Sequence, residues 1–272
     1  MLACGRVKQR FALLAFALVF PACQRAAPSP SPASTSTSAP LPDVALAADA
    51  RSAAGVRYLE RITGGAAPGD TLPLVIAIHG HGDRPDSFAG LFDGFSGRAR
   101  FIFPYGEPYG EGFSWFALTS RLNPDAIAAG TERAADRLAG MIAALVAERP
   151  TLGKPIVTGF SQGGMLSYTL AVLHPESLGE AFPVGGLLAP PHWPSTWATG
   201  KAQARIEAFH GDADRTVPIE VDRQTSTRLR AVGFTAELHE YPGVAHAVPI
   251  AMRRDLQAAI EAAVRRAASP PH

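Results

Sequence analysis

A serine in a glycine-rich turn is the residue whose surroundings most clearly suggest chemistry. Residues 159–164 read Gly-Phe-Ser-Gln-Gly-Gly, after an apolar segment from Pro155 to Thr158 and before a helical pattern. This spacing places Ser161 where a strand turns sharply into a helix, the arrangement known as a nucleophile elbow. Such a turn strains the serine backbone and brings other backbone so close that side chains at Gly159 and Gly163 would collide. We therefore expect the Ser161 hydroxyl to be lifted out of the fold.

Polar clusters follow three other apolar segments, each of which is interpreted as a strand. Leu74 to Ile78 precedes His-Gly-His-Gly-Asp at 79–83. Ile206 to Phe209 precedes His-Gly-Asp-Ala-Asp-Arg-Thr-Val-Pro at 210–218, and His246 follows a third predicted strand. Ligands and catalytic groups of an open α/β sheet gather at the carboxyl ends of its strands. The chain therefore offers a serine, an acid and a histidine, in that order, at such ends.

These residue types suit acyl transfer. A serine hydroxyl is a weak nucleophile at neutral pH, and a neutral imidazole is the usual base that activates it. His246 is the candidate base for Ser161. The imidazolium that forms during attack must be held in one tautomer by a carboxylate. Asp214 and Asp212 are the two candidates for that acid.

Together, these segments resemble the α/β-hydrolase superfamily, and within it the compact serine carboxylesterases that include the phospholipase/carboxylesterase and acyl-protein thioesterase family. The similarity extends over residues 74–246, and the motifs are more specific jointly than singly. The motifs are His-Gly-x-Gly-Asp at 79–83, Gly-x-x-Trp-Phe at 112–116, Gly-Phe-Ser-Gln-Gly-Gly at 159–164, His-Gly-x-x-Asp-x-x-Val-Pro at 210–218 and Gly-x-x-His at 243–246. The resemblance implies ester hydrolysis by Ser161.

The resemblance also implies roles for single residues. It implies Asp214 as the acid of the catalytic triad, which leaves Asp212 as a turn or helix-capping residue. It further implies an oxyanion hole made by the backbone N–H groups of Gln162 and His81. The family often has an apolar residue at the position of His81, so a histidine there departs from the pattern and would alter the polarity of the pocket.

Four aromatic residues are candidates for contacts with substrate. Trp115 and Phe116 belong to the Gly-x-x-Trp-Phe motif, whereas Trp193 and Trp197 follow the predicted strand that ends near Leu188. Tryptophans are also common packing residues, and that interpretation stays open for each of them.

No pattern in the sequence predicts a metal site or a cofactor, because neither His-Glu-x-x-His nor Cys-x-x-Cys spacing occurs. His79 and His210 end buried strands and are interpreted as hydrogen-bonded supports. His174 is expected at a helix C-terminus, where a cation is favourable. The sequence identifies no partner for the others, His192, His239 and His272.

Strand-like segments that alternate with helical ones predict an α/β-hydrolase fold with a mostly parallel, doubly wound sheet. Thr131 to Glu148 carries a helical apolar stripe, with Thr131 as the expected N-cap. Only residues 189–203 separate Leu188 from the strand near Ala204, so no large cap domain is expected. The other expected elements are strands at 56–62 (a sheet edge), 101–104, 182–188 and 235–241, and helices at 165–173, 217–231 and 247–268.

The N-terminal region differs in composition. Residues 1–22 combine three basic residues with an apolar stretch too short to span a bilayer, and a small residue precedes Cys23. The segment is similar to a bacterial lipoprotein signal, which implies lipidation of Cys23, attachment to a membrane and location in the cell envelope. Secretion and retention as an uncleaved anchor are the alternatives. Residues 23–50 are interpreted as a disordered tether rich in Pro, Ser, Thr and Ala, and residues 51–268 as the catalytic domain.

Composition is that of a soluble enzyme domain. With 272 residues, 47% of them hydrophobic, and a formal charge of +1, the chain has no global attraction for nucleic acid. The predicted function is a serine carboxylester hydrolase for short to medium acyl or aryl esters. Alternatives are a lysophospholipase or thioesterase, a polyester or feruloyl esterase, a peptidase, and a non-catalytic binding or structural envelope lipoprotein. The sequence indicates no oligomeric state.

Overall fold

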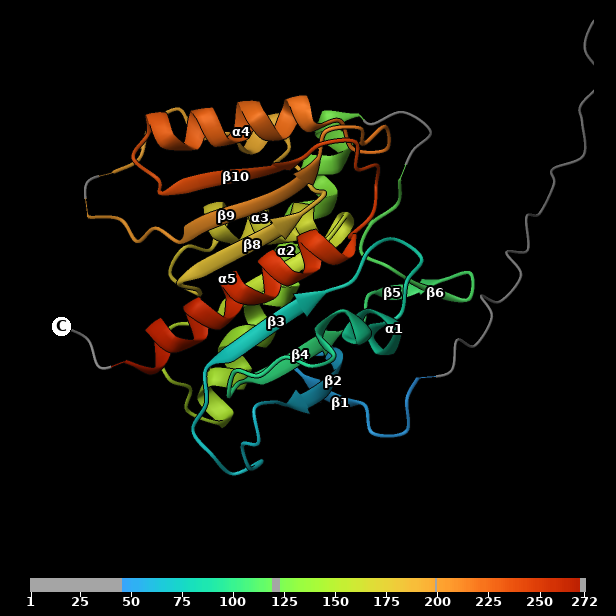
Figure 1. Ribbon diagram of the computed structural model, residues 1–272, viewed down its shortest axis with the longest axis vertical. Helices are drawn as coiled ribbons and strands as arrows, with labels where there is room; N and C mark the ends of the chain where they lie inside the picture. The colour runs from blue at the N-terminus through green and yellow to red at the C-terminus, as the bar shows by residue number, and fades with distance from the viewer. Residues whose placement is uncertain (1–45, 119–122, 199, 270–272) are drawn as a thin grey trace, which may run out of the picture. The chain divides into compact units, whose positions relative to one another are not determined.

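The computed structural model describes residues 46–118, 123–198 and 200–269. The predicted signal segment, Cys23, His272 and the tether up to residue 45 lie outside the described residues. Within these ranges an eight-stranded sheet has the order β1-β2-β4-β3-β7-β8-β9-β10 (Figure 1). Its strands are β1 (Arg51–Ala53), β2 (Val56–Ile62), β3 (Leu74–Ile78), β4 (Arg100–Pro104), β7 (Ile156–Phe160), β8 (Glu180–Val184), β9 (Arg205–Gly211) and β10 (Ala236–Tyr241).

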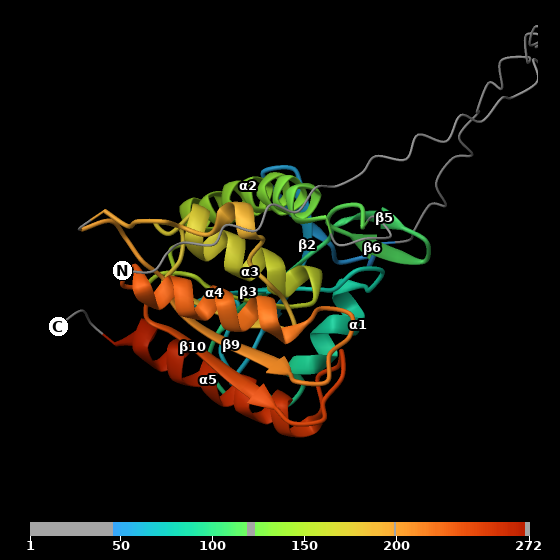
Figure 2. The ribbon, with the colours of Figure 1, turned by 90° about the horizontal axis from the view of Figure 1, so that it is seen from above.

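Helices cover both faces of this sheet. In β3, Leu74, Ile76 and Ile78 join one hydrophobic cluster, and Val75 and Ala77 join the other, because successive side chains of a strand point to opposite faces. Helices α2, α3 and α4 pack on the first face, and α1, η1 and α5 on the second (Figure 2). Their bounds are α1 (Pro85–Ala89), η1 (Gly90–Phe92), α2 (Pro124–Glu148), α3 (Gln162–Leu173), α4 (Ile219–Ala231) and α5 (Ile250–Ala268).

The sheet is parallel except at one side, where β2 runs antiparallel to both β1 and β4. The predicted doubly wound α/β-hydrolase fold is thus confirmed. Neighbouring strands β3 and β7 are in register with Ile78 opposite Gly159. This register brings the loop after β3 beside the turn after β7, so the first two polar clusters of the sequence meet at the carboxyl edge of the sheet.

Three expectations are wrong: the place of one strand in the sheet, the start of one helix and the bounds of another strand. Residues 56–62 do form a strand, but it is not the sheet edge, because β1 pairs outside it. Helix α2 begins at Pro124, and the side chain of Asn123 caps it by accepting hydrogen bonds from two backbone N–H groups. Thr131 is buried inside that helix and donates to the carbonyl of Ala128. The strand expected at 182–188 is β8, which begins and ends earlier in the chain, at Glu180 and Val184.

The connection between β8 and β9, where a cap domain could be inserted, is short. Among its described residues the regular structure is one 3-10 turn, η2 (Pro190–His192). The carboxyl edge of the sheet is therefore not covered by a large cap. Within the parts of the chain that the structure describes, no helix has the length and apolar character needed to cross a membrane.

Candidate active site

The turn after β7 has the strained geometry expected of a nucleophile elbow. Ser161 has φ 58° and ψ −115°, a region that side-chain-bearing residues rarely adopt. A Cβ atom at Gly163 would lie 1.9 Å from the carbonyl oxygen of Ile78, and one at Gly159 would lie 2.6 Å from the same oxygen. The predicted collisions are confirmed. Only glycine lets α3 start this close to β3, and this packing holds Ser161 at the tip of the turn.

The structure brings Ser161, His246 and Asp214 together. His246 Nε2 lies 2.9 Å from Ser161 Oγ, and His246 Nδ1 lies 2.6 Å from Asp214 Oδ2. The other oxygen of the buried Asp214 carboxylate accepts from the backbone N–H groups of Thr216 and Val217 at 2.8 and 2.9 Å. An ionised carboxylate only accepts, so His246 donates through Nδ1 and presents Nε2 as an acceptor to the serine hydroxyl. This is the hydrogen-bond order that general-base activation of a serine requires.

Asp212, the competing acid, has a different position. Its Oδ1 accepts from the backbone N–H of Gly243 at 2.6 Å, and its own N–H donates to the carbonyl of Tyr241. The next residue, Ala213, donates from its N–H to the carbonyl of Val244. These bonds tie the loop after β9 to the loop after β10. Asp212 thus braces the turn that carries His246, as a turn residue does.

Two backbone donors beside Ser161 are unused. Within the described chain, the N–H groups of His81 and Gln162 donate to no protein acceptor. The His81 loop lies against the serine, because a Cβ atom at Gly80 would be 3.4 Å from Ser161 Cβ. Gln162 is the first residue of α3, where free N–H groups and the helix dipole favour negative charge. The two N–H groups are the candidate oxyanion hole.

A hairpin that the sequence did not reveal holds this loop. Strands β5 (Glu107–Tyr109) and β6 (Gly112–Ser114) pair with each other, and β6 also bonds to the loop after β3. Gly82 N–H donates to the carbonyl of Phe113 at 2.8 Å, and Phe113 N–H donates to the carbonyl of Asp83 at 2.9 Å. The contact is so close that a Cβ atom at Gly112 would lie 2.2 Å from Gly82 O.

The side chain of Gln162 completes the bracing. Its Oε1 accepts from the N–H of Trp115 at 3.0 Å, and its Nε2 donates to the carbonyl of Phe116 at 2.8 Å. Trp115 in turn donates from its indole to the carbonyl of His79 at 3.0 Å. Trp115 and Phe116 are only 8% and 9% exposed, so their present contacts are packing contacts. The Gly-x-x-Trp-Phe motif was the signal for this support.

Comparison with known proteins agrees with this geometry. Residues 66–264 match the family described as phospholipase/carboxylesterase, which is well over half of the chain. The chain belongs to the phospholipase/carboxylesterase family. A probable carboxylesterase of Oryza sativa subsp. japonica is 32% identical over 122 residues, 44% of this chain and 45% of the relative. Acyl-protein thioesterase 1 of Gibberella zeae is 31% identical over 115 residues, which are 39% and 44% of the two chains.

The chain thus spans less than half the length of these curated relatives. Solved structures cover more of it. The crystal structure of esterase PE8 has a TM-score of 0.67 and 24% identity, and the similarity covers 76% of this chain and 98% of the esterase. At 24% identity the similarity to this structure shows the fold alone, and the match of residues 66–264 shows the family.

Two buried histidines support the site of this phospholipase/carboxylesterase family member. His79 Nδ1 donates to the carbonyl of Gly80 at 2.7 Å, and its Nε2 accepts from Gly106 N–H at 3.3 Å. Burial lowers the pKa of His79, in agreement with a neutral ring. His210 contacts Asp222 and the carbonyl of Val217. Both act as the hydrogen-bonded supports expected from sequence.

Among the described residues, the remaining histidines and two tryptophans also have partners. His174 caps the end of α3 and contacts Asp136, as its expected place at a helix terminus allows. His81 is half-buried, which lowers its pKa, and its Nδ1 lies 2.8 Å from Ser114 Oγ. The partners of the others are Ala128 for His192, Glu207 for His239, Leu188 and Thr225 for Trp193, and the ring of Phe234 for Trp197.

A groove of about 270 Å³, lined by both apolar and charged side chains, includes Phe160 of the elbow turn. The ring of Phe160 contributes to its wall and packs against the ring of His246 at 4.7 Å between centroids. Other residues of the wall are Asp83, Phe88, Leu91, Val248 and Arg253. In this family member Phe160 therefore links the groove to the imidazole that faces Ser161.

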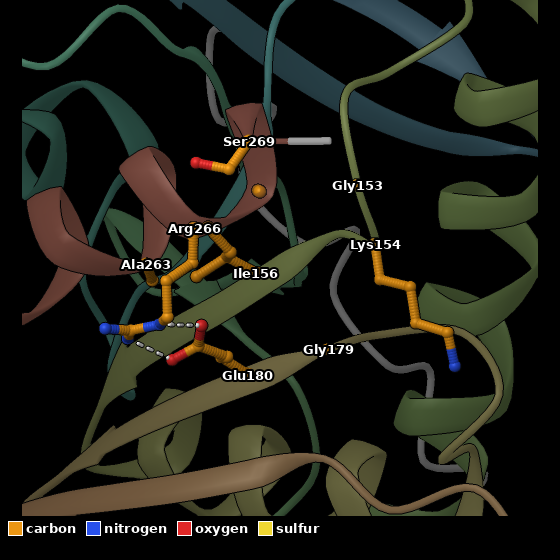
Figure 3. A pocket seen from close by; sticks show the side chains of 9 residues that line it. Gly153, Lys154, Ile156, Gly179, Glu180, Ala263, Arg266 and Ser269 are labelled. Atoms are coloured by element: carbon orange, nitrogen blue, oxygen red, sulfur yellow. Dashed lines mark hydrogen bonds and ion pairs between the residues drawn. The ribbon is translucent and has the colours of Figure 1, made fainter. Parts of the chain in front are cut away.

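A cavity and a cluster of possible metal ligands lie away from the site. A cavity of about 390 Å³ lies at the opposite edge of the sheet, beside the first residues of β7 and β8, and the ion pair of Arg266 with Glu180 lies in its wall (Figure 3). Glu207, Glu237 and His239 have ligand atoms within 4.8 Å of one another, an arrangement that could hold a metal ion. Arg205 forms ion pairs with both glutamates and already supplies the positive charge.

Proposed function

We propose that this chain is a serine carboxylester hydrolase that forms an acyl-enzyme at Ser161. The observation that carries the proposal is the unbroken hydrogen-bond chain from Ser161 Oγ through His246 to Asp214. As Oγ attacks the ester carbonyl carbon, His246 Nε2 takes the hydroxyl proton, and the Asp214 carboxylate stabilises the imidazolium. The N–H groups of His81 and Gln162 bind the developing oxyanion.

The same residues complete the catalytic cycle. His246 returns its proton to the leaving alcohol, and the alcohol departs with the acyl group left on Ser161. Water then attacks the acyl-enzyme, with His246 again accepting a proton, and the acid is released. Each oxyanion-hole donor stabilises the transition state by about 3 kcal/mol.

The groove beside His246 supports esters with a compact apolar group. Its volume of about 270 Å³ and the apolar part of its wall, Phe160, Phe88 and Leu91, suit a short alkyl chain or one aromatic ring, whereas Asp83, Ser87 and Arg253 line its polar part. The short connection between β8 and β9 leaves the serine accessible from solvent. We therefore assign short to medium acyl or aryl esters as the substrate class.

Thioesters are the second candidate substrate. The similarity to an acyl-protein thioesterase favours them, and the same nucleophile, base and oxyanion donors serve either reaction. Matched oxygen and sulfur esters of one acyl group separate the two, because the specificity ratio kcat/KM reports the preferred leaving group directly.

A fluorophosphonate probe tests the proposed nucleophile. The wild-type protein should be labelled at Ser161 and should hydrolyse p-nitrophenyl acetate, whereas Ser161→Ala should do neither. Ser52→Ala, an exposed serine on β1, is the matched control and should behave as wild type. Folded wild-type protein that neither reacts nor hydrolyses any ester in a panel of acyl, aryl, feruloyl and lysophospholipid substrates would instead favour a binding or structural protein.

We also propose that the chain is exported and anchored to the cell envelope through lipid on Cys23. The support is the basic and apolar composition of residues 1–22, which end in Ala22 directly before Cys23. Metabolic labelling with palmitate should depend on Cys23 and should survive Cys4→Ala. Equal labelling of wild type and Cys23→Ala would contradict the anchor.

A further inference from the structure

A second line of buried polar groups lies behind the Ser161–His246–Asp214 chain. His210, the next-to-last residue of β9, is fully buried. Its Nδ1 lies 2.8 Å from Asp222 Oδ2, and its Nε2 lies 2.8 Å from the carbonyl oxygen of Val217 and 3.4 Å from Asp214 Oδ2. Asp222, on α4, also accepts a hydrogen bond at Oδ1 from the hydroxyl of Tyr168 on α3. Side chains from β9, α3 and α4 thus form one connected cluster, and His210 is the member that reaches the carboxylate of Asp214.

Hydrogen-bond chemistry fixes the protons of this cluster. The carbonyl of Val217 can only accept, so His210 Nε2 carries a hydrogen. The Tyr168 hydroxyl donates to Asp222, and a donated hydrogen bond favours the ionised form of a carboxylate. An ionised Asp222 accepts from His210 Nδ1 as well, so both ring nitrogens carry hydrogens. His210 is then a positively charged imidazolium between two carboxylates.

Burial and charge favour the same state. Burial alone lowers the pKa of His210, but the hydrogen bond and charge of Asp222, the hydrogen bond to the Val217 carbonyl and the charge of Asp214 together outweigh it, so that the pKa of His210 is raised. Burial and the Asp222 carboxylate raise the pKa of Tyr168, which therefore stays a donor. The further charged group near His210 is Glu240, its neighbour on β10, which is neutralised by Arg223.

We propose that His210 is a buried imidazolium, held by Asp222 and Tyr168, that positions the Asp214 carboxylate and weakens its hold on the proton of His246. The Nε2 atom of the positive ring lies 3.4 Å from Asp214 Oδ2, the same oxygen that accepts from His246. A carboxylate whose charge is partly balanced from behind stabilises the His246 imidazolium less. The charge of His210 therefore sets how strongly Asp214 stabilises the His246 imidazolium.

His210 is a positioning residue in this scheme, because it acts on Ser161 only through Asp214 and His246. The catalytic part of its role rests on the proposed function, whereas its charge does not. Asp222→Asn is the informative variant. The asparagine has nearly the same shape, can accept from Tyr168 and can donate to His210 Nδ1, so the ring keeps its Nε2 hydrogen but loses its positive charge.

The first measurement is nitrogen NMR of the ring of His210 in the wild-type protein. We expect both ring nitrogens to be protonated from pH 6 to pH 8. The second is the pH profile of kcat/KM for p-nitrophenyl acetate. In Asp222→Asn the midpoint of the acid limb should move up by roughly 0.5–1 pH unit, the size expected for losing a charge pair one residue away from the triad.

Tyr168→Phe is the matched control, since it removes one hydrogen bond to Asp222 but leaves in place the direct contact between Asp222 and His210 that holds the two opposite charges together. It should lower stability and leave the acid limb within about 0.2 pH unit of wild type, a small fraction of the shift expected from removing the charge. A neutral His210 ring in the wild-type protein would overturn the proposal, and so would an unchanged acid limb in folded Asp222→Asn. An equal shift in both variants would also overturn it.

A protein that hydrolyses no ester would remove the proposed function but not this test. The pH midpoint at which the His246 ring titrates can be followed by NMR in wild type and in Asp222→Asn. It should move up by the same roughly 0.5–1 pH unit. The two failures are thus distinguishable, because the titration does not depend on turnover.

Discussion

His246 Nδ1 and Asp214 Oδ2 are joined by a hydrogen bond of 2.6 Å, although the two residues are 32 positions apart in the chain. The bond links the loop after β9 to the loop after β10, and these loops are also tied by backbone hydrogen bonds and by Asp212. Asp212 and Asp214 therefore do different work within one loop. One holds the turn, and the other holds the imidazole.

Asparagine substitutions should separate the two aspartates. In Asp214→Asn the amide favours the wrong tautomer of His246, and we expect kcat/KM to fall by about 10³–10⁴-fold with the fold intact. In Asp212→Asn the carbonyl oxygen can still accept from Gly243, so the loss should be less than about tenfold. Steady-state kinetics with p-nitrophenyl acetate measures both. A greater loss for Asp212→Asn would reverse the assignment.

Gly112→Ala should disrupt the support of the oxyanion loop. The new Cβ would lie 2.2 Å from Gly82 O, which is backbone and cannot yield cheaply. We expect the free energy of unfolding to fall by about 3 kcal/mol or more, together with activity. Gly140→Ala, at an exposed and open position of α2, should instead stabilise the protein by about 0.5–1 kcal/mol. Urea denaturation compares the two. A Gly112→Ala protein as stable as wild type would contradict the close contact.

Removing the strain at Ser161 should stabilise the protein. Ser161→Gly and Ser161→Ala both lack the nucleophile, but only glycine adopts φ 58° and ψ −115° without cost. Relief of about 1–3 kcal/mol of strain exceeds the entropic penalty of glycine, so Ser161→Gly should unfold at higher urea concentration and be about 1 kcal/mol more stable than Ser161→Ala. Equal stability of the two variants would mean that the elbow stores no strain.

His79 should make the fold sensitive to acid. Its folded pKa is lowered by burial, so below about pH 6.5 the unfolded chain binds the extra proton and unfolding is favoured. The resulting loss is at most about 1.4 kcal/mol per pH unit. His79→Gln can keep both hydrogen bonds without titrating, and its free energy of unfolding should fall less between pH 7 and pH 5.

The comparison of wild type with His79→Gln isolates His79, because His210 is present in both proteins. The raised pKa of His210 affects the pH dependence of stability with the opposite sign, and equally in both. Its stabilising effect is present at low pH and is lost as pH rises through its folded pKa. Parallel stability curves for wild type and His79→Gln would show that His79 is not kept neutral by the fold.

The sequence predicted the triad residues and most buried elements because their determinants are local. Leu74 to Ile78 is apolar throughout, as a strand buried on both faces requires, and Ser161 lies between glycines whose close contacts the structure confirms. Asp214 and His246 each follow a strand end. Parallel strands carry such ends to one edge of the sheet, so chain order brought these residues into one hypothesis, and the resemblance to a known family then selected Asp214 over Asp212.

Contacts between distant side chains were not predictable in this way. The hairpin of β5 and β6 has strands of three residues each, too short for a period-two pattern. The start of α2 depends on Asn123, an N-cap that lies eight positions before the threonine favoured by the apolar stripe. The partners of Gln162 and His210 come from other elements, and no spacing in the chain reports which side chains meet across a core.

The hairpin of β5 and β6 also bears on how the protein would work over many cycles. Its hydrogen bonds to Gly82 and Asp83, together with those from Gln162, fix the loop of His81 before any ligand arrives. The conformational freedom of that loop is therefore lost once, while the chain folds, and not again at each turnover. No rearrangement of that loop has to precede the proposed chemistry.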